Sequence, residues 1–168
     1  MIVAETARVV LRRFTLDDLD ALADIMARPE LMRYSYRGPQ SRDETAHMLR
    51  RFLERYELDG TGPYATIYKP DDRLAGFCGL PVHEIEGTRE VEVGYGLHPD
   101  YWGLGLATEA AAAIRDYAFE RLGLPRLVSI IKKDNLPSIG VATRIGMTYE
   151  RDVVFHGNAL QMYSIRRP

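Results

Sequence analysis

A strand-like run that leads into a pair of glycines, residues 90–110, constrains the fold of this chain more than any other segment. Its first part predicts a strand over 90–97, because apolar residues alternate with glutamate or glycine. One face would carry Val91, Val93, Tyr95 and Leu97, and the other Glu90, Glu92, Gly94 and Gly96. Two glycines beside a glutamate predict a bare track where a ligand can lie against the backbone.

The two glycines that follow, Gly103 and Gly105, open a predicted helix over 105–122. Glycines at a helix start let backbone N–H groups approach an anion at the positive end of the helix, which suits a pyrophosphate. The same spacing also serves a plain strand-to-helix turn. A dinucleotide-binding Gly-x-Gly-x-x-Gly motif is incomplete, since Thr108 holds the third position, and no Gly-Lys-Ser/Thr of a P-loop follows.

The rest of the chain predicts an α+β fold, a mixed sheet with helices on its faces, in the order β-α-α-β-β-β-α-β-α-β-β. Ser41 and Glu44 predict a capping box at the start of the second helix, and Pro29 is expected to end the first. The other predicted elements are strand 7–11, helices 16–28 and 42–58, an antiparallel meander of 64–68, 74–82 and 90–97, strand 127–131, a short helix from Asn135 to Gly146, and a hairpin of 148–155 with 159–165.

Composition narrows the functional class. The 168 residues predict one domain, 1–168, and the net charge of −2 without a basic stripe argues against nucleic acid or an anionic membrane as partner. No apolar run approaches the ~20 residues that span a bilayer, and the N-terminus lacks a signal-peptide pattern. Cys78 is the single cysteine and the four histidines are scattered, so we expect no disulfide and no metal site. The expected location is the cytoplasm.

Several motifs together resemble the GNAT superfamily of N-acetyltransferases, in its RimJ/RimL-like branch of ribosomal-protein-alanine N-acetyltransferases. Residues 101–110, Tyr-Trp-Gly-Leu-Gly-Leu-Ala-Thr-Glu-Ala, resemble the CoA-pyrophosphate loop of that family, with Trp102 in place of its polar first residue. Residues 135–138 resemble its Asn-x-x-Ser, 145–150 its Leu-Gly-Phe-x-x-Glu, and 6–12 its opening strand. Gly140, Thr143 and Met147 depart from the family pattern.

The resemblance implies the GNAT (acyl-CoA N-acyltransferase) fold with acetyl-CoA as cosubstrate, held where strands 90–97 and 127–131 splay apart. It implies that the backbone at Leu97, His98 and Pro99 meets the acetyl and pantetheine groups, and that Asn135 and Ser138 meet the pantetheine or the sulfur. The pyrophosphate would lie on the loop of Trp102, Gly103, Leu104, Gly105, Leu106, Ala107 and Thr108.

The chemistry of amine acetylation needs a proton acceptor, because an N-terminal amine or a lysine is protonated at neutral pH. Glu92, on the predicted ligand face, is the candidate base, acting through water, and Glu90 is the reserve. A solvated or salt-bridged strand glutamate is the alternative interpretation. By the resemblance, Ser138 would protonate the leaving thiolate, although first-turn capping explains it equally; Tyr149 and Tyr163 are alternative donors.

The expected activity is direct acetyl transfer to a primary amine, either a protein N-terminus or a small molecule. Cys78 lies in an apolar strand without an adjacent histidine and does not fit an acyl-enzyme nucleophile. Tyr34, Tyr36 and Arg37 are candidates for an acceptor pocket, with simple packing as the alternative. Two other functions stay open: a non-catalytic acyl-CoA-binding regulatory module with the same fold, and a nucleotide-binding protein of unrelated fold. A homodimer is the default expectation for assembly.

Overall fold

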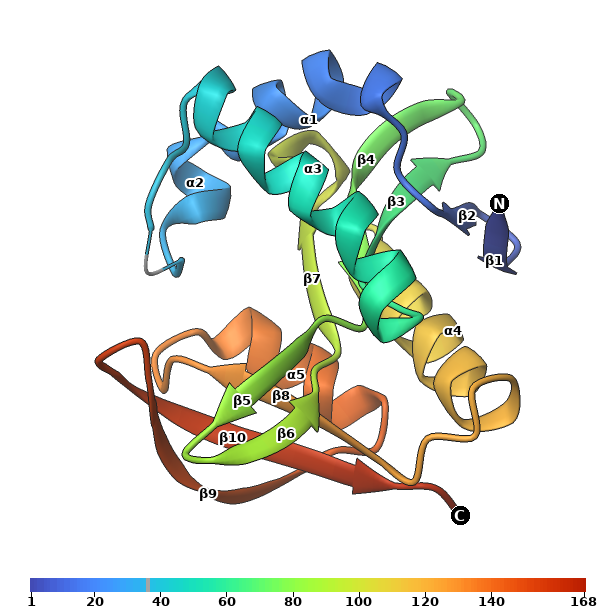
Figure 1. Ribbon diagram of the computed structural model, residues 1–168. Helices are drawn as coiled ribbons and strands as arrows, with labels where there is room; N and C mark the ends of the chain where they lie inside the picture. Colours follow the sequence, from blue (N-terminus) through green and yellow to red (C-terminus); the bar gives the residue numbers. More distant parts are fainter. Residues whose placement is uncertain (36) are drawn as a thin grey trace.

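Two sheets that touch at a single bridge form the scaffold of the protein (Figure 1). The computed structural model describes residues 1–35 and 37–168. The larger sheet is antiparallel, in the order β1-β2-β3-β4-β7, and the smaller has the order β8-β10-β9. The strands are β1 Ile2–Glu5, β2 Val9–Arg12, β3 Pro63–Tyr68, β4 Arg73–Gly79, β5 Val82–Ile85, β6 Thr88–Val91, β7 Gly94–Leu97, β8 Arg126–Ile131, β9 Thr148–Phe155 and β10 Asn158–Arg166. β5 and β6 pair as a separate hairpin.

Helices cover both faces of the larger sheet (Figure 1). They are α1 Leu19–Met26, α2 Pro29–Met32, α3 Arg42–Asp59, α4 Leu106–Glu120 and α5 Leu136–Arg144, with 3-10 turns at Leu16–Asp18 and Pro99–Tyr101. The predicted capping box of α3 is confirmed: Ser41 Oγ accepts from the Glu44 N–H at 3.2 Å, and Glu44 Oε2 accepts from the Ser41 N–H at 2.9 Å. Pro29 ends the first helix as expected, but it also opens the short α2 as its first residue, where a missing N–H costs nothing.

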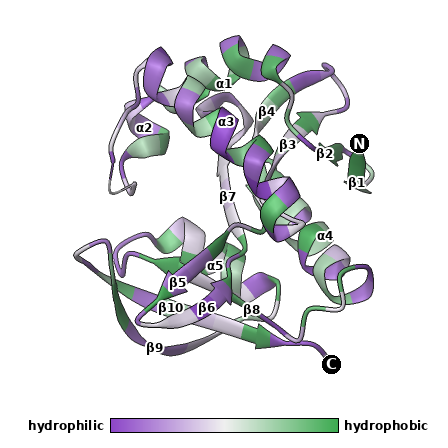
Figure 2. Ribbon diagram, viewed as in Figure 1, coloured by the Kyte–Doolittle hydropathy of each residue, from purple (hydrophilic) through white to green (hydrophobic). Residues whose placement is uncertain are grey.

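The hydrophobic core has one layer on each face of the larger sheet. On one face α4 packs through Ala110, Ile114 and Ala118, all fully buried, against the strands. On the other face α1, α2 and α3 enclose a second cluster that includes Leu22, Met32 and Leu49. Figure 2 shows the corresponding pattern on α3, where hydrophobic and hydrophilic residues alternate along the helix. None of the helices in the described part of the chain is long and apolar enough to cross a membrane.

Two of the predicted strands are each broken into two. The predicted strand 74–82 becomes β4 and β5 with Pro81 beside the break, and the predicted strand 90–97 becomes β6 and β7. At the second break the Glu92 N–H donates to the Pro81 carbonyl at 2.9 Å, while the Val93 N–H donates to the Val128 carbonyl at 2.8 Å. The chain therefore changes partner at Glu92, which alternation of side chains alone does not reveal. β1 was not predicted; it forms because it pairs with β2.

The parting of β7 from β8 decides where the site lies. Just before β7 begins, Glu92 forms one parallel bridge with Val128 of β8, which Ser129 Oγ reinforces by donating to the Val93 carbonyl at 2.8 Å. Beyond that point β7 pairs with β4, and β8 pairs with β10. The predicted splay between these strands is thus confirmed, and Figure 1 shows β7, the edge strand of the larger sheet, diverging from β8 of the smaller one.

Candidate active site

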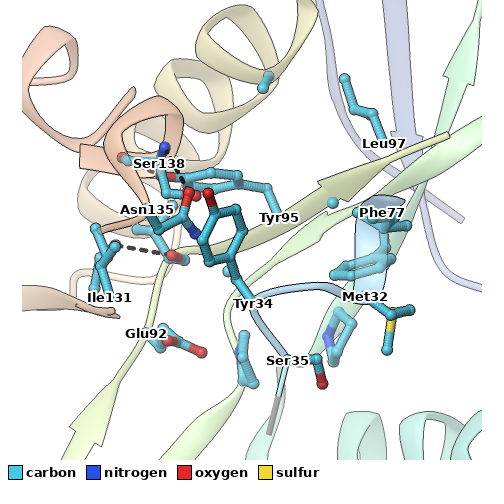
Figure 3. A pocket seen from close by; sticks show the side chains of 18 of the residues that line it. Met32, Tyr34, Ser35, Phe77, Glu92, Tyr95, Leu97, Ile131, Asn135 and Ser138 are labelled. Atoms are coloured by element: carbon cyan, nitrogen blue, oxygen red, sulfur yellow. Dashed lines mark hydrogen bonds between the residues drawn. The ribbon is translucent and has the colours of Figure 1, made fainter. Parts of the chain in front are cut away.

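A cleft of about 1860 Å³ opens where β7 and β8 diverge. The start of α4 and the start of α5 border one half of it. α2, the segment after it and α3 border the other half, together with β5 and the turn between β9 and β10. Figure 3 shows side chains from these separate elements converging on one space: Tyr34 and Ser35, Glu92, and Asn135 with Ser138.

The loop before α4 has the backbone conformation that its glycines predict. Gly103 and Gly105 both have φ of +76°, a backbone conformation that residues other than glycine rarely adopt. A Cβ on Gly103 would meet nothing within 4 Å, so this stretch of backbone is open to a ligand. Leu106, Ala107 and Thr108 form the first turn of α4, whose N–H groups have no intrahelical partner, and all three border the cleft. The loop therefore offers an anion-binding helix start.

Trp102 ties this loop to the end of β7. Its indole Nε1 donates to the Leu97 carbonyl at 2.8 Å, while the side chain stays half-exposed at the cleft. Leu97 borders the cleft, whereas His98, Pro99 and Leu104, also predicted as binding residues, do not. His98 instead contacts other parts of the chain: its N–H donates to the Ala75 carbonyl at 2.8 Å, and its ring accepts from the Asp100 N–H at 3.1 Å.

The start of α5 places two predicted residues at the cleft. Asn135 caps the helix, its Oδ1 accepting from the Ser138 N–H at 3.3 Å, so the capping side chain is that of Asn135 and not that of Ser138. Ser138 borders the cleft, and its hydroxyl makes no hydrogen bond to another residue in the described part of the chain. Capping therefore uses the Ser138 backbone and leaves its hydroxyl available to a ligand.

Tyr95 is a cleft residue that sequence reasoning did not single out. It comes from β7, is largely buried, and its hydroxyl donates to the Ser138 carbonyl at 2.8 Å, joining β7 to α5 across the cleft. Burial raises the pKa of this phenol well above its usual value. The hydroxyl of a tyrosine in a buried strand needs a hydrogen-bond partner, so a tyrosine in such a strand is a sequence signal for a contact between two elements.

Glu92 lies at the bridge between the two sheets, with its carboxylate in the cleft. Its side chain is 16% exposed. Oε1 is 3.1 Å from His83 Nε2, and Oε2 accepts from the Ile130 N–H at 3.4 Å. An ionised carboxylate only accepts hydrogen bonds, so the Nε2–H tautomer of His83 is the donor in this pair. Two donors from different strands therefore orient the candidate base.

Glu90, the reserve candidate, does not share the position of Glu92. Its buried carboxylate accepts from Arg126 Nε at 3.1 Å and Nη2 at 3.2 Å, and it does not border the cleft. Arg126 also donates to Glu150 at 2.6 and 2.8 Å, and these bonds lower the pKa of Glu150 to about 2. The prediction that Glu90 and Glu92 share a ligand face is wrong because Glu90 lies within β6, whereas the chain leaves β6 after Val91 and changes its hydrogen-bond partner at Glu92.

The predicted bare track is also wrong at Gly96. A Cβ there would lie 2.7 Å from Phe77 Cζ and 3.1 Å from Leu31 Cδ1, so neighbouring side chains already fill this space. Gly94 is close to the candidate base, since a Cβ would lie 3.2 Å from Glu92 Oε1. The two glycines thus allow Phe77 and Glu92 to pack closely over β7.

The remaining candidate residues divide into predicted proton donors and predicted acceptor-pocket residues. Tyr149 and Tyr163, the alternative proton donors, do not border the cleft; Tyr149 donates to Asp152 at 2.9 Å and is half-exposed. Tyr34 and Arg37, predicted for the acceptor pocket, do border it. Tyr36 lies outside the described residues. Among the described residues, no cluster of three or more His, Cys, Asp or Glu side chains has the arrangement of a metal site.

Comparison with known proteins agrees with this geometry. The model of the acetyltransferase (GNAT) domain matches residues 8–148. The uncharacterised N-acetyltransferase p20 of Bacillus licheniformis is 30% identical over 146 residues, 86% of this chain and 82% of p20. The crystal structure of an acetyltransferase from Agrobacterium tumefaciens is 30% identical, with a TM-score of 0.83 over 96% of this chain and 92% of that one.

The ribosomal L7/L12 acetyltransferase RimL, solved in complex with coenzyme A, has the same fold. Its TM-score is 0.82 at 18% identity, over 99% of this chain and 98% of RimL. A family model that covers most of the chain, together with these similarities in sequence and fold, settles the classification. This chain belongs to the GNAT family of N-acetyltransferases.

Proposed function

We propose that this acetyltransferase transfers the acetyl group of acetyl-CoA directly to a primary amine, with Glu92 as the general base. One observation carries the proposal: an oriented carboxylate and a glycine-rich helix start open into the same cleft. The carboxylate suits removal of a proton from an amine, and the helix start suits a pyrophosphate.

The cleft residues fit acetyl-CoA. Gly103, Gly105 and the first turn of α4 would hold the pyrophosphate through backbone N–H groups, since the space above Gly103 is open. The end of β7 and the start of α5 would border the pantetheine, with Asn135 and Ser138 nearest its sulfur end. His98, Pro99 and Leu104 do not border the cleft, so the proposed binding set leaves them out.

Glu92 provides the base that the reaction needs. The amine must lose a proton before its nitrogen can form a bond to the acetyl carbon, and that proton passes to the Glu92 carboxylate, directly or through one water. The bond between the acetyl carbon and the sulfur breaks, and the leaving thiolate takes up the second proton, which the nitrogen loses as the amide forms. His83 and the Ile130 N–H hold the carboxylate in place during this exchange. The products are an N-acetylated amine and CoA.

Ser138 is the proposed donor to the leaving thiolate. Its hydroxyl borders the cleft, and its backbone is held by Asn135 on one side and by Tyr95 on the other. A thiol has a pKa of about 8.5, so a donor assists the departure of the thiolate without being essential. Tyr149 and Tyr163 do not replace it, since neither borders the cleft.

Two acceptor classes suit this chemistry, a protein N-terminus and a small-molecule amine. A non-catalytic module that only binds acyl-CoA is the alternative function, and the oriented Glu92 argues against it. Both the transferase and the module predict CoA binding, and only the transferase predicts turnover.

A single cysteine and a pI of about 6.1 suit a cytoplasmic location.

The deciding experiment has two measurements. Thermal unfolding with acetyl-CoA at 100 times its Kd should show a stabilisation of about 2.7 kcal/mol, with much less from NAD or ATP. Release of free thiol is then followed with a panel of primary amines. Stabilisation without thiol release would support the non-catalytic module, and no stabilisation would reject acetyl-CoA as the cosubstrate.

A further inference from the structure

The half of the cleft formed by α2, the segment after it and α3 is strongly cationic. We call this the acceptor half, because its lining comes from elements other than the α4 and α5 residues proposed for acetyl-CoA. Its charged side chains are Arg33, Arg37, Arg51, Arg55 and one acid, Glu30. Glu92 itself is the other carboxylate of the cleft lining. The acceptor half therefore carries four arginines against one acid, or against two when Glu92 is included.

The protein neutralises some of this charge and leaves the rest. Arg55 Nη1 lies 3.4 Å from Asp59 Oδ2, within the same helix. Arg33 lies over the ring of Tyr34, with 5.1 Å between guanidinium carbon and ring centroid, which orients the side chain without cancelling its charge. In the described part of the chain neither Arg33 nor Arg51 forms a salt bridge. Two uncompensated guanidinium groups thus border the acceptor half.

Gln40 adds a second, independent observation. It precedes α3, borders the cleft and is 7% exposed. Its Oε1 is buried and has no hydrogen-bond partner among the described residues. Buried amides in proteins nearly always have a partner, and an amide that lacks one beside a cleft is suited to bind a polar ligand.

We propose that the acetyl acceptor is a small primary amine that also carries an anionic group, a carboxylate or a phosphate. Arg33 and Arg51 bind the anion, and Gln40 Oε1 accepts a hydrogen bond from an N–H or O–H donor of the same molecule. Guanidinium groups are well suited to carboxylate and phosphate, because they offer paired donors in one plane. The same charges repel a diamine or polyamine. This inference rests on the proposed amine acetyltransferase activity and specifies its substrate class.

Three amines of similar size test the proposal: 4-aminobutyrate, butylamine and 1,4-diaminobutane. They differ at the far end, which is anionic, neutral or cationic. We expect kcat/KM for thiol release to fall in that order, with at least a tenfold difference between the first and the last. The preference should weaken as ionic strength rises, because salt screens exposed charges. Phosphoethanolamine against ethanolamine repeats the comparison for a phosphate.

Matched variants connect the preference to the cleft. Arg51→Gln should reduce the ratio of kcat/KM for 4-aminobutyrate to that for butylamine at least fivefold, and Arg33→Gln should act in the same direction. Arg50→Gln is the control, since it makes the same charge change on α3 at a residue that does not border the cleft. It should leave the ratio and the activity as in the wild type.

The outcomes separate this inference from the proposed function. Thiol release that is equal for the three amines, or fastest with 1,4-diaminobutane, would overturn the anionic acceptor while the acetyltransferase activity stands. An unchanged ratio in both Arg51→Gln and Arg33→Gln would also overturn it. No thiol release with any amine, despite binding of acetyl-CoA, would refute the proposed function and the inference with it.

Discussion

His83 Nε2 lies 3.1 Å from Glu92 Oε1, so an imidazole on β5 holds the carboxylate at the junction of the two sheets. The ring of His83 packs against Phe155 of β9 with 5.0 Å between ring centroids. The second carboxylate oxygen receives the Ile130 N–H of β8. Glu92 is therefore oriented by two strands that belong to different sheets, which is the arrangement expected of a positioned base.

The variant Glu92→Gln tests the base directly. It keeps the shape of the side chain but removes the basic site, so kcat should fall by 10² to 10⁴ while acetyl-CoA affinity hardly changes. Higher pH should restore part of the activity, because more of the amine is already neutral. Glu84→Gln, an exposed residue of β5 outside the cleft, is the control. Near-normal kcat at neutral pH in folded Glu92→Gln would remove Glu92 from the mechanism.

The contact between His83 and Glu92 makes a second prediction. His83→Leu removes a hydrogen bond to a charged group, which is worth about 1.5–3 kcal/mol, so kcat should fall roughly 10- to 100-fold. His83→Gln retains a donor and should recover part of that loss, which a purely structural role would not predict. His47→Leu, on the exposed face of α3, is the matched control. Equal kcat for His83→Leu and the wild type would show that Glu92 needs no such support.

The loop before α4 is tested by Gly105→Val. This residue has φ of +76° at the start of the helix, and a branched side chain would strain the backbone and obstruct the anion site. Acetyl-CoA affinity should fall at least tenfold, or about 1.4 kcal/mol, measured by calorimetry. Gly87→Val is the control, because Gly87 has φ of +82° in the turn between β5 and β6, outside the cleft. Equal losses of affinity in both variants would assign the effect to folding.

The ion pairs of Arg126 predict a dependence of stability on pH. Hydrogen bonds from Arg126 lower the pKa of Glu150 to about 2, against about 4.3 in an unfolded chain. The unfolded state therefore binds more protons between these values, so this contribution is complete above about pH 4.3 and is lost as the pH falls towards 2. Urea unfolding between pH 6 and 3 should show a shallower decline for Glu150→Gln than for the wild type. An identical decline would show that this pair does not contribute.

The local elements could be predicted from the sequence because their signals are local. Ser41 and Glu44 stand three residues apart, and each bonds the backbone of the other, so the start of α3 needs no tertiary information. The same holds for Asn135 at the start of α5. Gly103 and Gly105 adopt positive φ because the loop turns sharply into α4, and glycine is the residue that permits it.

Contacts between distant segments depend on the tertiary structure alone. Thr6 Oγ1 donates to Glu109 Oε1 at 2.6 Å, and Arg8 Nη2 lies 2.6 Å from Glu109 Oε2, so the turn after β1 is fastened to the first turn of α4. Burial alone would raise the pKa of Glu109, but the hydrogen bonds from Thr6 and Arg8 lower it overall. The sequence motifs at 6–12 and 101–110 indicate a family, but not that these residues touch.

The sequence by itself determined the glycine turn before α4, the caps and the order of most elements, since each depends on residues within a few positions of one another. The tertiary structure decided which glutamate enters the cleft. Residues 90 and 92 look equivalent in an alternating strand, yet the chain changes its hydrogen-bond partner at Glu92. Glu90 is thereby directed to Arg126, and Glu92 to His83 at the point where β7 and β8 diverge. A strand break of this kind depends on a neighbouring strand far away in the chain, so side-chain alternation does not reveal it.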